Sequence, residues 1–149
     1  MSRWLVVAAA SRTIAIPVGV VEEVVELTDP LPVPGRTAAT RGVVPVRGRL
    51  LPLASLAAGI GMASASGPGG AGVVLRVGGR RLVLEVDEVT DLVAAPVEPL
   101  PHGWEGGWAS AALRGGTMLV PILDPEWLVQ RLDEDAERPM REGEGVKTA

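Results

Sequence analysis

Short apolar runs separated by tight turns recur along most of the chain. Four pairs of runs flank turn signals, which lie at residues 11–12, 47–49, 78–80 and 114–116. Two apolar runs on either side of a short polar or glycine-containing turn are typical of a β-hairpin. The 19 glycines and 13 prolines favour many turns over long helices. The pattern therefore predicts an all-β fold built from hairpins.

Two short helices are expected, one after the second hairpin and one after the fourth. Residues 53–58 tolerate a helix that stops at Gly59. Asp124 precedes Pro125 and Glu126, which is the residue order of an N-cap followed by a first helical turn. A helix is therefore predicted to begin after Asp124.

The segments between these elements are of different kinds. Residues 20–27 mix apolar pairs with acids, which leaves a strand and a helical turn both open. Three prolines in residues 28–36 and a second proline-rich stretch at residues 96–101 indicate extended connections. The glycine-rich residues 62–72 indicate a loop. The charged residues 133–149 have little to bury, so we expect a flexible C-terminal tail.

The chain also contains a weak internal repeat, with an offset of roughly 67–69 residues. The hairpin turn at residues 47–48, for example, recurs at residues 114–115. We therefore expect one domain over residues 1–132, made of two similar β halves at about 1–65 and 70–132 that pack on each other. Chance similarity between valine-rich strands is the alternative.

Composition argues against several classes of function. With 14 basic and 18 acidic residues the formal net charge is -4, so the chain has no basic surface suited to nucleic acid. The absence of cysteine and a single histidine, His102, argue against a metal site. The glycine-rich residues 62–72 lack the spacing and the lysine of a phosphate-binding loop. Asp87, Glu88 and Asp91 have no nucleophile or base beside them. We therefore expect no enzyme, no metal and no cofactor.

The N-terminal apolar run is short and leads directly into the first hairpin. It does not resemble a signal peptide with a cleavage site. No segment approaches the roughly 20 apolar residues that a bilayer span requires. We expect a cytoplasmic protein without direct membrane insertion.

Candidate binding residues gather at the second hairpin, where the turn is Arg47-Gly48-Arg49. Gly48 can adopt a positive φ, so the chain can reverse there while the two arginines project outward. An arginine presents a planar fork of donors to a carboxylate or a carbonyl group. A solvated hairpin tip is the alternative interpretation of these arginines.

Three other residues attract attention. Glu85 is the one charge inside the apolar run 82–86, and strict alternation would turn it toward solvent or a partner. Trp104 and Trp108 lie in a glycine-rich stretch. Tryptophan is frequent at binding hot spots, so the sequence leaves two roles equally open for these side chains: packing over the hydrophobic core, or contact with a partner.

Residues 42–53, which form the second hairpin, are Gly-Val-Val-Pro-Val-Arg-Gly-Arg-Leu-Leu-Pro-Leu. This stretch resembles the signature G-V-x-N-L-R-G-x-x-x-P-V of CheW-like domains, the adaptors that couple chemoreceptors to the histidine kinase CheA. Other family motifs follow in the expected order: residues 21–24 match V-x-E-I, residues 86–89 match V-D-x-V, and residues 119–124 with Leu128 match L-x-x-L-L-D-x-x-x-L. The resemblance extends from about Trp4 to Val129.

The resemblance implies two intertwined, five-stranded SH3-like barrels packed together, with a short helix after each half. It implies a non-catalytic scaffold in chemotaxis or a related signal transduction pathway, working by protein-protein interaction. One surface would dock the regulatory domain of a CheA-type histidine kinase. The groove between the barrels would take the cytoplasmic tip of a chemoreceptor, a methyl-accepting chemotaxis protein. The positions that match the family's receptor contacts are Val21, Glu23, Gly42, Arg47, Val89 and Leu92.

Several positions depart from the family pattern. Pro45 replaces an asparagine, Ser55 replaces an aspartate, and Val83 replaces a glycine. These departures indicate a divergent member. Two alternatives therefore stay open: a CheW-like protein that binds only the kinase or only the receptor, and a small β-barrel that binds a ligand or peptide outside signalling.

Overall fold

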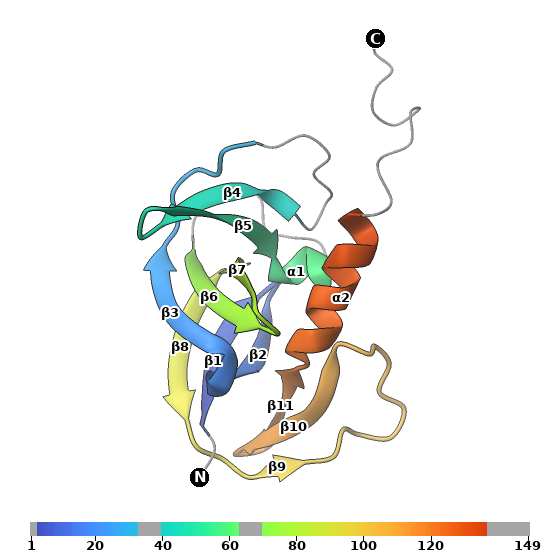
Figure 1. The fold of residues 1–149 in the computed structure, drawn as a ribbon. Helices are drawn as coiled ribbons and strands as arrows, with labels where there is room; N and C mark the ends of the chain where they lie inside the picture. The colour runs from blue at the N-terminus through green and yellow to red at the C-terminus, as the bar shows by residue number, and fades with distance from the viewer. Residues whose placement is uncertain (1–2, 33–39, 63–69, 137–149) are drawn as a thin grey trace.

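The structure is a computed structural model that describes residues 3–32, 40–62 and 70–136 (Figure 1). Strands account for most of these residues, which confirms the predicted all-β fold. The elements in chain order are β1 (Trp4–Ala9), β2 (Arg12–Pro17), the 3-10 helix η1 (Val18–Val20), β3 (Val21–Glu26), β4 (Thr40–Val46), β5 (Arg49–Ser55), α1 (Leu56–Gly59), β6 (Ala71–Val77), β7 (Arg80–Val86), β8 (Glu88–Val93), β9 (Val97–Glu98), β10 (Ala109–Gly115), β11 (Met118–Leu123) and α2 (Pro125–Ala136).

The strands form two sheets. One has six strands in the order β8-β1-β2-β11-β10-β9, and the other has five in the order β3-β6-β7-β5-β4. The four predicted hairpins are present as the antiparallel pairs β1–β2, β4–β5, β6–β7 and β10–β11. Residues 20–27, which the sequence left open, contain strand β3.

Each sheet takes its inner hairpin from the other part of the chain. Strands β6 and β7 lie between β3 and β5, while β1 and β2 lie between β8 and β11. In both sheets the inserted hairpin pairs in the same way. It is antiparallel to an edge strand on one side, β3 or β8, and parallel to an inner strand on the other, β5 or β11. Neither sheet is complete without the exchanged hairpin, so the two β units are intertwined. The division of the chain into halves and a tail stays a prediction.

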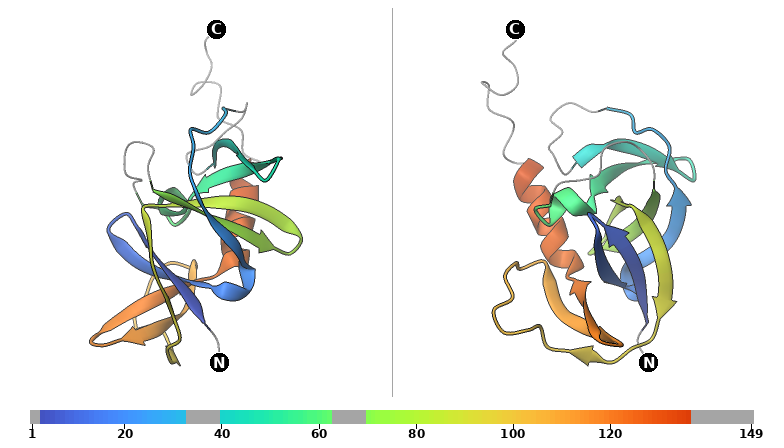
Figure 2. Two further views of the ribbon diagram at one scale, coloured as in Figure 1. Left: turned by 90° about the vertical axis from the view of Figure 1, so that its left-hand side faces the viewer. Right: turned by 180° about the vertical axis from the view of Figure 1, so that it is seen from behind.

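The main hydrophobic core lies between the two sheets and α2, which runs along one side of both (Figure 2). Two smaller clusters lie within the individual sheets. In the five-stranded sheet, Val44 on one edge strand and Val25 on the other belong to the same small cluster. A sheet whose two edges share one cluster must be strongly curved, as an SH3-like unit is.

The helix caps follow from the sequence. The Ser55 hydroxyl accepts a hydrogen bond from Ala58 N at 3.1 Å, so this serine caps α1. One carboxylate oxygen of Asp124 accepts from the backbone N–H of Glu126 and of Trp127, at 3.1 and 3.2 Å. Helix α2 then continues to Ala136, so residues 133–136 are helical where a tail was predicted. The rest of the predicted tail and parts of the predicted connections, residues 33–39 and 63–69, lie outside the described residues.

The expectation for Glu85 was wrong. Both faces of β7 are covered, because Leu84 is fully buried in the main core and Val83 is fully buried in the smaller cluster of the five-stranded sheet. The Glu85 side chain is only 13% exposed, and its Oε1 lies 3.0 Å from Arg41 Nη1. Burial raises the pKa of this carboxyl group, although Arg41 acts in the opposite direction. The alternation itself holds, since Leu82, Leu84 and Val86 share the main core, but the face that carries Val83 and Glu85 is also packed and is not open to solvent.

The two tryptophans belong to the core. Trp108 is 6% exposed, and Trp104 packs partly buried against the same cluster. Their rings meet edge to face with centroids 5.5 Å apart. Of the two roles left open by the sequence, the structure supports packing against the hydrophobic core.

Candidate functional site

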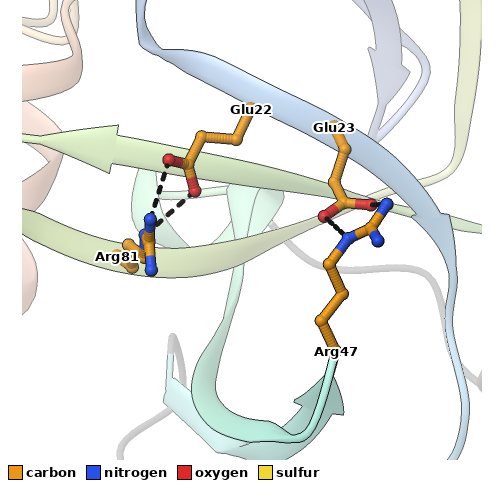
Figure 3. A network of polar contacts seen from close by, with 4 residues as sticks. All are labelled: Glu22, Glu23, Arg47 and Arg81. Atoms are coloured by element: carbon orange, nitrogen blue, oxygen red, sulfur yellow. Dashed lines mark hydrogen bonds and ion pairs between the residues drawn. The ribbon is translucent and has the colours of Figure 1, made fainter.

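The tip of the β4–β5 hairpin carries the candidate residue Arg47. Arg47 and Gly48 form the turn, with φ of 50° and 80°, the left-handed geometry that suits the twist of a two-residue hairpin. Arg47 Nε donates a hydrogen bond to Glu23 Oε2 at 2.7 Å, and Nη2 donates to Oε1 at 3.1 Å (Figure 3). The fork expected for a partner is therefore already engaged with a carboxylate of the same chain.

Glu23 lies on β3, at the edge of the five-stranded sheet opposite β4. The ion pair with Arg47 joins these two edges and so spans the open side of the curved sheet. The hydrogen bond from Arg47 lowers the pKa of Glu23, and the bond to Glu23 raises the pKa of Arg47. Both groups are charged at neutral pH. The Arg47 side chain is 77% exposed, so its remaining donors face solvent.

A second ion pair lies beside the first. The register between β3 and β6 shifts between Val21 and Glu23, which leaves Glu22 as the extra residue of a β-bulge. Glu22 Oε1 lies 3.0 Å from Arg81 Nε, and Arg81 Nη2 donates to Oε2 at 3.2 Å. Through the bulge, the consecutive acids Glu22 and Glu23 reach two different arginines, Arg81 on β7 and Arg47 at the β4–β5 turn, as Figure 3 shows.

The structure distributes the other predicted residues over both sheets. Val21 lies on β3 close to Glu23, whereas Val89 and Leu92 lie on β8, an edge strand of the six-stranded sheet. Strands β3 and β8 run along the same side of the molecule, at the left of Figure 1. Val21 and Val89 pack partly buried against the main core, and Leu92 is 44% exposed. These four residues and Arg47 therefore belong to one side of the protein, with apolar and charged groups mixed.

Gly42 has a backbone role. Its φ is 134°, and an added β carbon would lie 2.3 Å from the carbonyl oxygen of Leu31. Leu31 and Val43 exchange two backbone hydrogen bonds at this point, of 2.8 and 2.9 Å. The glycine therefore lets residues 30–31 pass close to β4.

Sequence reasoning missed a pocket of about 330 Å³ in the six-stranded sheet. Its walls are mainly apolar, and it is lined by Val6, Thr90, Asp91, Val93, Ala95, Leu113, Arg114, Gly115 and Val120. Arg114 was predicted only as a hairpin tip, but the carboxylate of Glu98 on β9 engages both its Nε and its Nη2. The lining comes from several strands distant in sequence, so no single stretch signals the pocket.

Two of the three acids that were considered for catalysis, Asp87 and Asp91, accept hydrogen bonds from the backbone. Asp87 Oδ2 accepts from Ala10 N at 3.1 Å, and Asp91 Oδ1 accepts from Leu92 N at 2.7 Å. Within residues 3–32, 40–62 and 70–136, no group of three or more metal-binding side chains lies close enough together to hold an ion. In the same residues, no helix has the length and apolar character of a membrane span.

Both the sequence and the fold are similar to those of known proteins. The sequence model of the family described as CheW-like domain matches residues 3–133. Among solved structures, the chain is similar to the crystal structure of the scaffolding protein TtCheW from Thermoanaerobacter tengcongensis, with a TM-score of 0.76 and 17% sequence identity. That similarity covers 85% of this chain and 86% of the other, and at this identity it shows the fold. No curated protein matches the sequence.

Proposed function

The chain belongs to the CheW-like domain family, and from this premise we propose that it is a cytoplasmic adaptor that couples chemoreceptors to a CheA-type histidine kinase. Family membership supports a non-catalytic chemotaxis scaffold in general. The single observation that carries the proposal is the extent of the family match, which runs over both sheets and most of α2. A scaffold with two partners needs both of its β units, and this chain retains both.

We assign the receptor to the side that carries β3 and β8. Val21, Val89 and Leu92 offer apolar contacts there, and the Glu23–Arg47 pair offers charge at the rim. An apolar centre with a charged rim suits an amphipathic helix of a receptor tip. Arg47 acts by holding Glu23 in place and by offering its remaining N–H groups to the partner. Gly42 contributes by shaping β4. The kinase surface is not assigned to particular residues.

Two separate binding experiments test the proposal. The purified protein is tested against the cytoplasmic-tip fragment of a chemoreceptor and against the regulatory domain of a CheA-type kinase, both from its own organism. Both should bind. Arg47→Ala should weaken receptor binding by about tenfold or more, as truncation of a hot-spot residue does, and should leave kinase binding unchanged.

Arg12→Ala is the matched control, because Arg12 is an exposed arginine beside a different hairpin turn. It should leave both affinities unchanged. Binding of only one partner would identify a single-partner adaptor. If the folded protein binds neither partner, the proposal is refuted in favour of a ligand-binding or peptide-binding barrel.

A further inference from the structure

One end of the five-stranded sheet carries a cluster of arginines that the proposed function does not use. Arg49 begins β5, Arg76 lies near the end of β6, and Arg81 lies near the start of β7. Together with Leu51 and Gly79 they line a hollow of about 500 Å³. Leu51 also belongs to the small core inside this sheet. The hollow therefore combines an apolar floor with a cationic rim.

The charge of this arginine cluster is only partly compensated. Arg76 and Arg81 lie directly opposite each other on paired strands, an arrangement of like charges that destabilises a sheet. Glu22 pairs with Arg81 (Figure 3). Arg49 and Arg76 have no ion-pair partner within the described part of the chain. Two uncompensated cations thus lie together in a protein whose formal net charge is -4.

The repeated architecture does not require the arginine cluster. In the six-stranded sheet, the place of the Arg76–Arg81 pair is taken by Ala8 opposite Thr13. The place of Arg49, at the start of the second strand of its hairpin, is taken by Met118. The six-stranded sheet thus forms equivalent hairpins and equivalent strand pairs with uncharged residues at all three positions. The arginine cluster is therefore a feature of this surface and not of the fold.

We propose that Arg49 and Arg76, with the Glu22-paired Arg81 beside them, bind an acidic segment of a partner protein in which carboxylates alternate with apolar side chains. Guanidinium forks bind carboxylates with two parallel hydrogen bonds, and an apolar side chain of the segment would cover Leu51. An anion between Arg76 and Arg81 would also relieve the repulsion across the two strands. A long polyanion such as nucleic acid fits less well, because the net negative charge of the protein repels it beyond short range. The inference concerns residues outside the receptor-facing set and holds whichever proteins the adaptor couples.

A peptide-binding experiment tests this inference. A fluorescent peptide of alternating aspartate and leucine, blocked at both ends, is titrated with the full-length protein at low salt. We expect saturable binding that weakens as salt is added. Arg49→Gln combined with Arg76→Gln should weaken binding by about tenfold or more. Arg3→Gln combined with Arg12→Gln removes the same charge from exposed positions elsewhere and should leave the affinity within about twofold.

A charge-preserving variant separates the fork geometry from charge alone. Arg49→Lys combined with Arg76→Lys keeps the net charge and should still lose affinity, because lysine cannot make the two-bonded contact. It also serves as the informative variant if the glutamine pair fails to fold. Arg76→Thr, which replaces one of the two opposed charges with a neutral residue that favours strands, should leave the thermal midpoint unchanged or raise it.

Any of the following results would overturn the inference. No peptide binding at low salt, or equal losses in the two glutamine double variants, would show that the arginine cluster has no special affinity. Tighter binding of a length-matched single-stranded oligonucleotide would assign the cluster to nucleic acid. A large fall in thermal midpoint for Arg76→Thr would assign Arg76 to stability. None of these results bears on the receptor and kinase assays, so the two proposals can fail separately.

Discussion

The substitution Gly42→Ala should destabilise the fold, and any loss of partner binding should follow from that. The new β carbon would lie 2.3 Å from Leu31 O and 3.1 Å from Leu31 C. Both are backbone atoms, so a small side-chain movement cannot relieve the overlap. The φ of 134° at Gly42 adds strain, because residues with a side chain rarely adopt it.

The size of the effect follows from the contacts that must break. If residues 30–31 move away, the hydrogen bonds Leu31 N to Val43 O and Val43 N to Leu31 O are lost. Each contributes about 1 kcal/mol net. An unfavourable backbone conformation costs about 1–3 kcal/mol. Allowing for some relaxation, we expect the free energy of unfolding to fall by about 2–4 kcal/mol.

Urea unfolding followed by circular dichroism measures this change. With a slope of about 2 kcal/mol per molar urea, the middle of the usual range, the midpoint should fall by roughly 1–2 M. Gly19→Ala is the matched control, because a β carbon there meets nothing within 4 Å. It should change stability by less than about 0.5 kcal/mol. An unchanged midpoint for Gly42→Ala together with lost receptor binding would refute the backbone argument and make Gly42 a direct contact.

Three further predictions concern the ion pairs and the caps. Glu23→Gln and Arg47→Ala should weaken receptor binding by amounts that do not add, because the two residues act as one unit; additive losses in the double variant would contradict this. Burial raises the pKa of Glu85 above its ordinary value of 4.5, so the folded protein holds this proton to higher pH than the unfolded chain does. The stability of the wild type relative to Glu85→Gln should therefore be greatest below about pH 4.5 and fall as pH rises through the folded pKa, and a difference in urea midpoint that is constant from pH 4 to 8 would argue against it. Ser55→Ala removes the bond to Ala58 N and should cost about 1 kcal/mol of stability by the same urea method, whereas no change would show that the cap is dispensable.

Local features were predictable from the sequence because they depend on neighbours in the chain. The turn at Arg47 and Gly48 forms as expected, since two residues between apolar runs need the left-handed geometry that glycine permits. Asp124 caps α2 because an acceptor side chain placed just before the first turn meets its free N–H groups. The all-β class and the family followed from the same local patterns taken together.

The candidate site depended on tertiary structure. The sequence named Glu23 and Arg47 separately, but their pairing arises because the sheet curves until the β4–β5 turn comes within reach of β3. Packing on both faces of β7 buried Glu85, which the sequence had placed toward solvent or a partner. The hollow rimmed by Arg49 and Arg76 likewise exists only because three strands come together there. The order and curvature of the strands are set by packing between segments that are distant in the sequence. This packing determines which charged side chains meet and which strand faces are buried.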